Sequence, residues 1–391
     1  MRILRPSSVL LTPTCLRTDL VLVVDEKRME WIEAASAPTT VEVENFDDQL
    51  WTAAPIMFHA HLESWDAPAE LWHRSSFSEW VTDLLQWRSQ AQRQSATQSY
   101  EASWNELAQN GCGAVFASAS DLESEAYLND ELIGRCEVAT ELFAPDVENA
   151  HAVWNQQSDS ARAVALHSPF GCSERLARLA FRWLQSKETA LLSLHLGEHE
   201  EEREYLATGK GKLADLLHAR GRGAKAGVWN SPVDWLEHVA PGMVAGALAV
   251  HCGDLSSMEL EQLLAKQVQV VWCPGTHQYF DRKIPKFWQA QMPAPFLGCD
   301  SRASNLELNP LREVRIARQS LPEYGPTEWW SAITERSANY WNQFLPNRCS
   351  ERQFLRLKNP RLSSAAEVCD YLTAEDNLKP LQEPGLPQTT T

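Results

Sequence analysis

The sequence has no long apolar runs, no paired cysteines and no excess of basic charge, and each absence excludes a class of protein. Its 391 residues contain no apolar stretch of about 18 residues, the length that a membrane-spanning helix needs. Lys and Arg number 35 against 52 Asp and Glu, a net charge of −17, which argues against nucleic acid or an anionic membrane as partner. The nine cysteines are scattered without a CxxC pair, which favours a reducing cytoplasm over a disulfide framework.

Several catalytic motifs are also missing. The sequence contains no GxSxG elbow, no GxxxxGK[ST] phosphate loop and no GxGxxG that follows a strand. The N-terminal apolar stretches are interrupted by Pro6, Pro13, Arg17 and Asp19, so we expect strands there rather than a signal peptide. These absences leave a cytoplasmic protein that acts on a small molecule as the favoured class.

Eight short apolar segments alternate with amphipathic, helix-like stretches. Alternation of this kind over about 250 residues is typical of a (β/α)8 TIM barrel. We therefore predict an α/β fold with a barrel at 53–347, a small and reduced β-sandwich subdomain built mainly from the N-terminus at 1–52, and a C-terminal extension at 348–391. The Pro/Thr-rich tail of that extension is expected to be disordered. The eight expected strands are 54–61, 114–118, 137–143, 163–167, 190–196, 247–252, 268–273 and 296–299.

Five residues able to bind a metal or move a proton stand at the carboxyl ends of expected strands: His59, His61, His195, His251 and Asp300. In a closed parallel barrel these ends converge on one mouth. The His-x-His pair places two imidazoles on one face of its strand, since strand side chains repeat every two residues. The alternative is ordinary strand-end histidines and an aspartate that caps a turn. The common placement of all five favours a metal site.

A carboxylate beside such an ion has a second use. A divalent ion lowers the pKa of bound water to about 7, and Asp300 could both hold the ion and accept the water's proton. Glu198, three residues after His195, could carry a proton to a substrate nitrogen. The acids at 201, 202 and 204 are expected only to favour a helix N-terminus and stay solvated. His167 is equally consistent with a substrate contact and with a hydrogen-bonded loop histidine.

The fourth expected strand, ARAVALHSP, offers no lysine that could be carbamylated to bridge two ions, so a single-metal site is the better hypothesis. The chain carries a set of motifs in an order that resembles the amidohydrolase superfamily. It is most similar to the single-metal aminohydrolase branch, which contains cytosine and S-adenosylhomocysteine deaminases, chlorohydrolases and 6-aminodeoxyfutalosine deaminase. Within this branch the motifs resemble those of 6-aminodeoxyfutalosine deaminase most. The resemblance runs from about residue 50 to 315 through HAHLES (59–64), FSEWVTDLLQWR (77–88), GCGAVFASASD (111–121), LHSPFGCSERL (166–176), HLGEHEEE (195–202), SPVDWLEHV (231–239), AVHCGDL (249–255), VVWCP (270–274) and LGCDSRASN (297–305).

The resemblance implies roles for particular residues. His59, His61, His195 and Asp300 would bind one divalent ion, Zn²⁺ or Fe²⁺, and His251 would orient the attacking water. Glu198 would protonate the ring nitrogen, while Asp300 would pass the water's proton to the leaving ammonia. The expected substrate contacts are His167, Glu63 and Ser301.

Two features depart from the family pattern. Gly275-Thr276-His277 replaces the usual basic residue followed by Ser-Asn, and the C-terminus lacks a G-x-x-ADL-like segment. The favoured function is a metal-dependent hydrolytic deaminase of an aminated heterocycle, such as the purine nucleoside-like 6-aminodeoxyfutalosine of menaquinone biosynthesis. A chlorohydrolase-like enzyme and an inactive barrel used for binding are the alternatives. A homodimer is compatible with this class of barrel, although no segment marks an interface.

Overall fold

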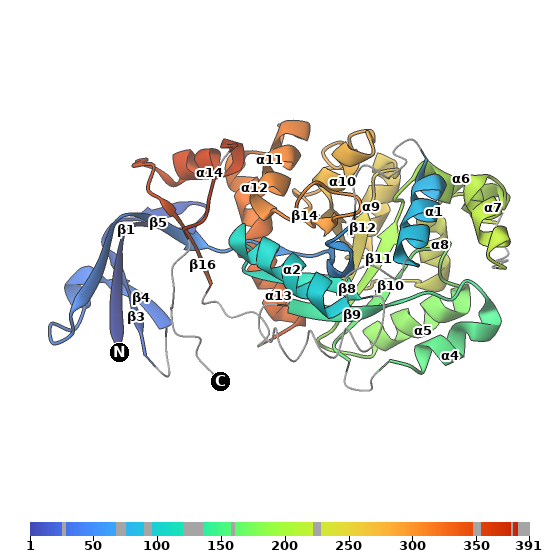
Figure 1. Cartoon of the computed structure of the whole chain (residues 1–391), viewed down its shortest axis with the longest axis horizontal. Coiled ribbons are helices and arrows are strands. Elements are labelled where there is room, and N and C mark those ends of the chain that lie inside the picture. The colour runs from blue at the N-terminus through green and yellow to red at the C-terminus, as the bar shows by residue number, and fades with distance from the viewer. Residues whose placement is uncertain are drawn as a thin grey trace.

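The computed structural model describes residues 1–25, 29–67, 76–89, 96–119, 136–157, 161–221, 228–346, 353–376 and 378–381. A parallel barrel forms the larger part, and a sheet of mostly N-terminal strands lies at one end of the molecule (Figure 1). The residues of the predicted disordered tail beyond 381 lie outside the described ranges. Among the described residues, no helix combines the length and apolar character needed to cross a membrane.

The barrel follows the predicted order of strands. Neighbouring strands pair in parallel from the first to the eighth, and the eighth pairs with the first, so the sheet closes. Apolar runs buried on both faces are what a parallel sheet requires, and the predicted fold class is confirmed as a barrel with an N-terminal sheet subdomain. The eight strands are β6–β7 (Ile56–Met57 and Ala60–His61), β8 (Ala114–Ala119), β9 (Cys136–Leu142), β10 (Ala163–Leu166), β11 (Leu191–Leu196), β12 (Ala247–His251), β13 (Gln269–Trp272) and β14–β15 (Phe296–Leu297 and Asp300–Ser301).

The first strand is irregular at the point that matters for the site. Its pairing with β8 shifts by one residue between Met57, which faces Val115, and His61, which faces Ser118. A one-residue shift reverses which side chains face inwards. Phe58 belongs to the apolar cluster inside the barrel, and the shift turns both following histidines towards the same mouth.

Helices cover the barrel, and the barrel interior is closed at the end opposite the mouth. Trp341 and Phe344 from α13 join the interior apolar cluster there. The helices are α1 (Phe77–Arg88), α2 (Ala96–Gln109), α4 (Ala150–Trp154), α5 (Glu174–Gln185), α6 (Glu200–Thr208), α7 (Lys212–Ala219), α8 (Pro232–Val239), α9 (Ser257–Ala265), α10 (Pro274–Tyr279), α11 (Pro310–Ser320), α12 (Pro326–Ile333), α13 (Glu335–Phe344) and α14 (Ala365–Ala374), with short 3-10 turns η1 (Ala34–Ser36), η2 (Leu62–Ser64) and η4 (Val147–Asn149).

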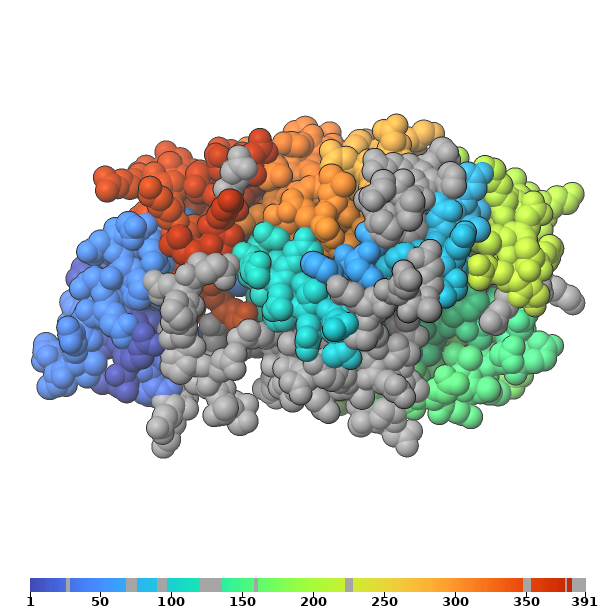
Figure 2. Space-filling view, in the orientation of Figure 1, coloured from blue at the N-terminus to red at the C-terminus, as the bar shows by residue number. Residues whose placement is uncertain are grey.

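The second sheet pairs the strands of the first 53 residues with one strand that lies after the barrel. Its order is β16-β5-β1-β3-β4, with β2 paired to β1. Strand β16 runs antiparallel to β5, and the C-terminal segment packs beside the N-terminal sheet (Figure 2). A single described sheet therefore takes the place of the expected sandwich, and a strand from the predicted C-terminal extension supplies one edge. The strands are β1 (Arg2–Thr12), β2 (Cys15–Arg17), β3 (Leu20–Val24), β4 (Met29–Glu33), β5 (Val43–Ala53) and β16 (Phe354–Lys358).

Candidate metal centre and active site

Four of the predicted metal ligands meet at the barrel mouth. His195 Nε2 lies 3.2 Å from His59 Nε2 and 3.4 Å from His61 Nε2, and His59 Nε2 lies 3.6 Å from Asp300 Oδ1. Two overlapping groups that share His59 could each hold an ion, namely His59, His61 and His195, and His59, His251 and Asp300. The structure thus brings together the predicted ligands of the first, fifth and eighth strands, with His251 of the sixth strand beside them.

The spacing of these atoms fits a divalent ion of the zinc type. Two nitrogens at about 2.05 Å from one ion, with a tetrahedral angle between them, stand about 3.3 Å apart. The observed nitrogen–nitrogen distances of 3.2 and 3.4 Å match that separation. Since His195 Nδ1 donates to the carbonyl of His167 at 2.6 Å, its Nε2 carries a lone pair. The ring nitrogens and the Asp300 oxygen that converge at these distances therefore fit such an ion.

Asp300 is held by two hydroxyl groups. Thr276 Oγ1 and Ser304 Oγ each donate to Asp300 Oδ2 at 2.9 Å. This leaves Oδ1 as the oxygen nearest to His59. Burial raises the pKa of Asp300, but the hydrogen bond from His59 and the neighbouring histidines lower it well below its usual value, so the carboxyl is ionised. Asp300 also has a left-handed backbone, with φ of 54°, a conformation that Asp tolerates better than most residues.

His61 is supported from behind by an ion-pair chain. Its Nδ1 lies 3.5 Å from Glu63 Oε1, and Arg88 Nη2 donates to that same oxygen at 3.0 Å. Burial lowers the pKa of His61, but the hydrogen bond to Glu63 and the charge of Glu141 outweigh this effect and raise the pKa to about 9. A carboxylate behind an imidazole orients the ring and raises the basicity of its other nitrogen, as is usual for metal-binding histidines. The structure places Glu63 behind a ligand rather than along the cavity, and its substrate role stays a prediction.

Glu198, the predicted proton donor, adjoins His251, which was predicted to orient the attacking water. Glu198 Oε1 lies 3.9 Å from His251 Nε2. Burial raises the pKa of Glu198, although the Arg282 charge opposes the shift. Burial also lowers the pKa of His251 well below its usual value, so this imidazole is neutral. Leu248 and Val250 face the barrel interior, and a left-handed backbone at His251, with φ of 73°, ends the strand and redirects its side chain to the mouth.

A cavity of about 460 Å³ opens over this cluster. The predicted substrate contacts His167 and Ser301 line it, together with Glu198, His251 and Asp300. Its outer walls are mostly apolar, with Arg88 and Arg220 as the charged exceptions. The apolar residues come from α1, α7 and the loops after β9 and β10, and are Phe77, Trp80, Val81, Leu84, Leu85, Leu213, Leu216, Leu217, Phe143 and Phe170. A charged floor under apolar walls suits a flat, partly apolar ligand with a few polar groups.

Sequence reasoning missed Glu141. Its Oε1 lies 3.3 Å from His195 Nδ1, and it lines the cavity. The signal was present, because Glu141 is an ionisable residue inside an expected buried strand and shares its inward face with Ala139. Thr276, Ser304 and Arg282 carried no such signal, since they lie in connecting segments outside the strands.

Of the three acids expected to be solvated, Glu204 is exposed, but Glu201 and Glu202 are buried. Glu202 is fully buried and accepts hydrogen bonds from the backbone of Gly197 and Glu198 at 3.2 and 3.4 Å. Glu201 accepts from the backbone of Phe77 and Ser78 at the start of α1, each at 3.1 Å. These carboxyl groups are buried because the backbone N–H groups of the loop after β11 and of the first turn of α1 need hydrogen-bond acceptors.

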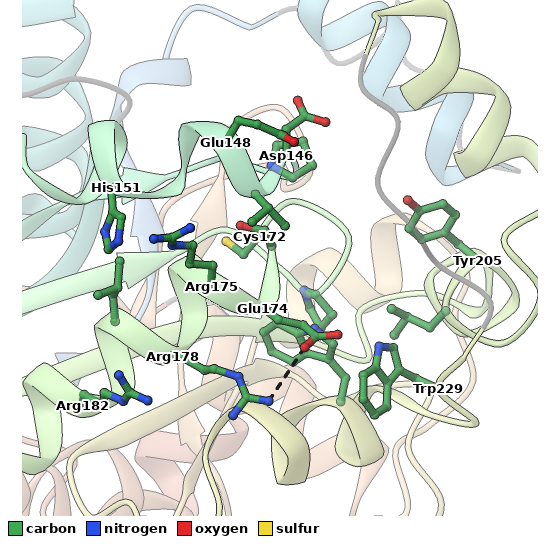
Figure 3. A pocket seen from close by; sticks show the side chains of 17 residues that line it. Asp146, Glu148, His151, Cys172, Glu174, Arg175, Arg178, Arg182, Tyr205 and Trp229 are labelled. Carbon is green, nitrogen blue, oxygen red and sulfur yellow. Dashed lines mark ion pairs between the residues drawn. The ribbon is translucent and has the colours of Figure 1, made fainter.

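A larger hollow, of about 770 Å³, lies away from the predicted metal ligands (Figure 3). Arg175, Arg178 and Arg182 project from α5 on one side of it, and Arg178 pairs with Glu174 at 3.7 Å. None of the predicted ligands or substrate contacts lines this hollow. Size alone does not mark a site, and the convergent groups with shifted pKa values surround the smaller cavity.

Comparisons with known proteins find similar sequences among deaminases. No family model matches the chain. It is 22% identical to an aminodeoxyfutalosine deaminase from Nitratiruptor over 332 residues, which cover 81% of this chain and 80% of the relative. It is 29% identical to a 5-methylthioadenosine/S-adenosylhomocysteine deaminase from Pelotomaculum thermopropionicum over 170 residues, or 42% of this chain and 34% of the relative.

Solved structures match over nearly the whole chain. The aminofutalosine deaminase of Helicobacter pylori, in complex with methylthio-coformycin, has a TM-score of 0.77, 18% identity and 97% coverage of both chains. The atrazine chlorohydrolase of Arthrobacter aurescens, with zinc and atraton, has a TM-score of 0.69, 13% identity and coverage of 94% and 90%. All these matches are members of the amidohydrolase superfamily, so the resemblance predicted from the motifs is confirmed.

Proposed function

We propose that this protein is a single-metal hydrolase that deaminates a purine nucleoside-like substrate, with 6-aminodeoxyfutalosine as the best candidate. The observation that carries the proposal is the convergence of His59, His61, His195 and Asp300 beneath a cavity that also holds Glu198 and His251. The curated relatives and a structural neighbour are named as deaminases of nucleosides. Deaminases are hydrolases of carbon–nitrogen bonds, and the predicted enzyme class agrees with these names.

The metal would be held by the three imidazole Nε2 atoms and Asp300 Oδ1. A divalent ion there supplies Lewis acidity and a water that ionises near neutral pH. Nitrogen ligands suit zinc and also suit iron. One structural neighbour contains zinc, which supports zinc as the first ion to test.

The side chains around the ligands divide the proton transfers. Asp300, ionised and fixed at Oδ2 by two hydroxyl groups, accepts a proton at its other oxygen. Neutral His251 orients the attacking water with its ring Nε2. Glu198, whose raised pKa makes it a better proton donor near neutral pH, protonates the ring nitrogen next to the reacting carbon. The proton from Asp300 then leaves with ammonia, and the hydroxyl proton that is lost as the carbonyl forms returns to Glu198.

The cavity supports a nucleoside-like substrate for two reasons. Its mostly apolar walls can contact both faces of a heterocycle, while His167 and Ser301 offer polar atoms along its lining. Burial lowers the pKa of His167 to about 4, so this imidazole is neutral and can donate or accept a single hydrogen bond.

The eight described cysteines are free, which supports the proposal of a reducing cytoplasm.

The test combines metal analysis with ammonia release from 6-aminodeoxyfutalosine, adenosine, S-adenosylhomocysteine, cytosine and guanine. We expect one ion per chain and turnover of a purine nucleoside. Glu198→Gln should keep the ion and lower kcat by about 10² to 10⁴. A metal-replete protein that is inactive on the whole panel would leave a binding barrel or another leaving group as the better explanation.

A further inference from the structure

A buried arginine lies directly behind Glu198. Nη2 of Arg282 donates to Glu198 Oε1 at 3.4 Å, and both side chains are nearly enclosed, at 8% and 11% exposure. Arg282 follows α10, in a segment for which the sequence predicted no function. Within the described part of the chain, Glu198 is the one carboxylate in ion-pair distance of this guanidinium.

The surroundings of Arg282 differ from those of an arginine that only fastens a loop. Its guanidinium lies over the ring of Phe280 at 4.4 Å, and Phe280 packs edge-on against Trp80 at 5.3 Å. Its Nε and Nη1 have no hydrogen-bond partner among the described residues. Buried Arg312, by contrast, donates to side-chain oxygens of Asn305 and Gln278. A buried guanidinium normally forms hydrogen bonds with all of its donors. Arg282 does not, so its ion pair with Glu198 is the best explanation for its buried position.

We propose that Arg282 is a positioning residue for the deamination reaction, which fixes Oε1 of Glu198 so that Oε2 remains for the substrate nitrogen. This inference rests on the proposed function, because it requires Glu198 to act on the substrate. A glutamate side chain has three rotatable bonds, and a proton donor works only when its oxygen lies within hydrogen-bond reach of the acceptor. The aromatic ring under Arg282 holds the guanidinium in one plane, and the guanidinium in turn limits the carboxylate.

The role predicts a particular kinetic pattern. Proton transfer belongs to the chemical step, so loss of the guanidinium should lower kcat and change KM little. Lysine should restore only part of the rate, because an ammonium is a point charge that cannot lie flat over Phe280 and present the same fork. A guanidinium ion from solution should fill the space left by alanine and recover activity.

The experiment compares Arg282→Ala and Arg282→Lys with Arg336→Ala as the matched control. Arg336 is half-buried over an aromatic ring, at 4.9 Å from Phe296, and donates to the carbonyl of Ala294, outside the cavity. With the substrate that the wild type deaminates, Arg282→Ala should lower kcat by about tenfold to a hundredfold with KM within about threefold. Added guanidinium chloride in the millimolar range should raise its kcat, whereas Arg336→Ala should keep the wild-type kcat and show no such response.

A double variant decides whether Arg282 acts through Glu198. In the Glu198→Gln background, Arg282→Ala should lower kcat by less than about twofold, because both changes remove the same function. An active wild type with an unchanged kcat in Arg282→Ala, or an equal loss in both backgrounds, would overturn the inference and leave the proposed function standing. An inactive wild type overturns the proposed function itself. If Arg282→Ala does not fold, Arg282→Met, which keeps the side-chain volume, replaces it.

Discussion

Replacing Gly298 by alanine is expected to weaken metal binding, because this glycine lies against His59, one of the proposed metal ligands. Gly298 stands between β14 and β15, two residues before Asp300. A Cβ added there would lie 2.8 Å from His59 Cβ, 2.9 Å from the His59 carbonyl oxygen and 2.9 Å from Cys273 Sγ. Ordinary van der Waals contacts begin at 3.4 Å, so His59 or Cys273 must move.

The size of the effect follows from these distances. Relief of the closest contact needs a displacement of about 0.6 Å, whereas metal–ligand distances tolerate about 0.2 Å. We therefore expect the Kd for zinc to rise at least about tenfold, which corresponds to about 1.4 kcal/mol. Overpacking in a close-packed barrel should also reduce the free energy of unfolding of the metal-free protein by about 1–3 kcal/mol.

Zinc affinity is measured by competition between the metal-free protein and a chromophoric chelator, and stability by urea unfolding. Gly325→Ala is the matched control, because Gly325 has an ordinary φ of −69° and nothing lies within 4 Å of an added Cβ. The control should keep the wild-type Kd for zinc. A Gly298→Ala protein with wild-type zinc affinity and stability would show that His59 is not packed against this glycine, and the account of the cluster would be wrong.

Two further substitutions test groups that support the site. Burial raises the pKa of Glu202 to about 8, so the folded protein keeps a proton that the unfolded chain loses above about pH 4.5. Stability should therefore fall as the pH rises from about 4.5 to 8, and Glu202→Gln should flatten that slope in urea unfolding; equal slopes would contradict the buried carboxyl. Thr276→Val removes one of two hydroxyl donors to Asp300 and should raise the Kd for zinc by about tenfold, as measured by chelator competition. An unchanged Kd would show that Ser304 alone suffices.

The strands and the meeting of the main candidate ligands could be predicted because they depend on short patterns. Apolar runs of four to eight residues mark buried strands, and each expected segment overlaps a strand of the closed barrel. The barrel then places the ends of distant strands together, which is why His59, His195 and Asp300 could be grouped before their distances were known. The one-residue shift in the first strand was not predictable, because register depends on the neighbouring strand rather than on the strand's own sequence.

The supporting residues could not be predicted, because their roles depend on tertiary contacts. Thr276 was noticed only as a departure from the family pattern, and in the structure it donates to Asp300. Arg282 lies in a connecting segment with no periodicity. The acidic run after Glu198 resembles a solvated helix start, and only the packing of α1 against it makes Glu201 an acceptor for backbone donors. Composition cannot distinguish these two environments.

The edge strand β16 has a consequence for the order of folding during synthesis. The hydrogen bond from Asn359 to Ser7 Oγ, 2.6 Å long, joins positions 352 residues apart, so the sheet cannot be completed until the chain has left the ribosome as far as residue 359. Until then β5 keeps an unpaired edge that other nascent chains could join. Contacts of such long sequence separation form slowly, and chaperones that shield strand edges should therefore increase the yield of this protein more than they increase that of a barrel without the added sheet.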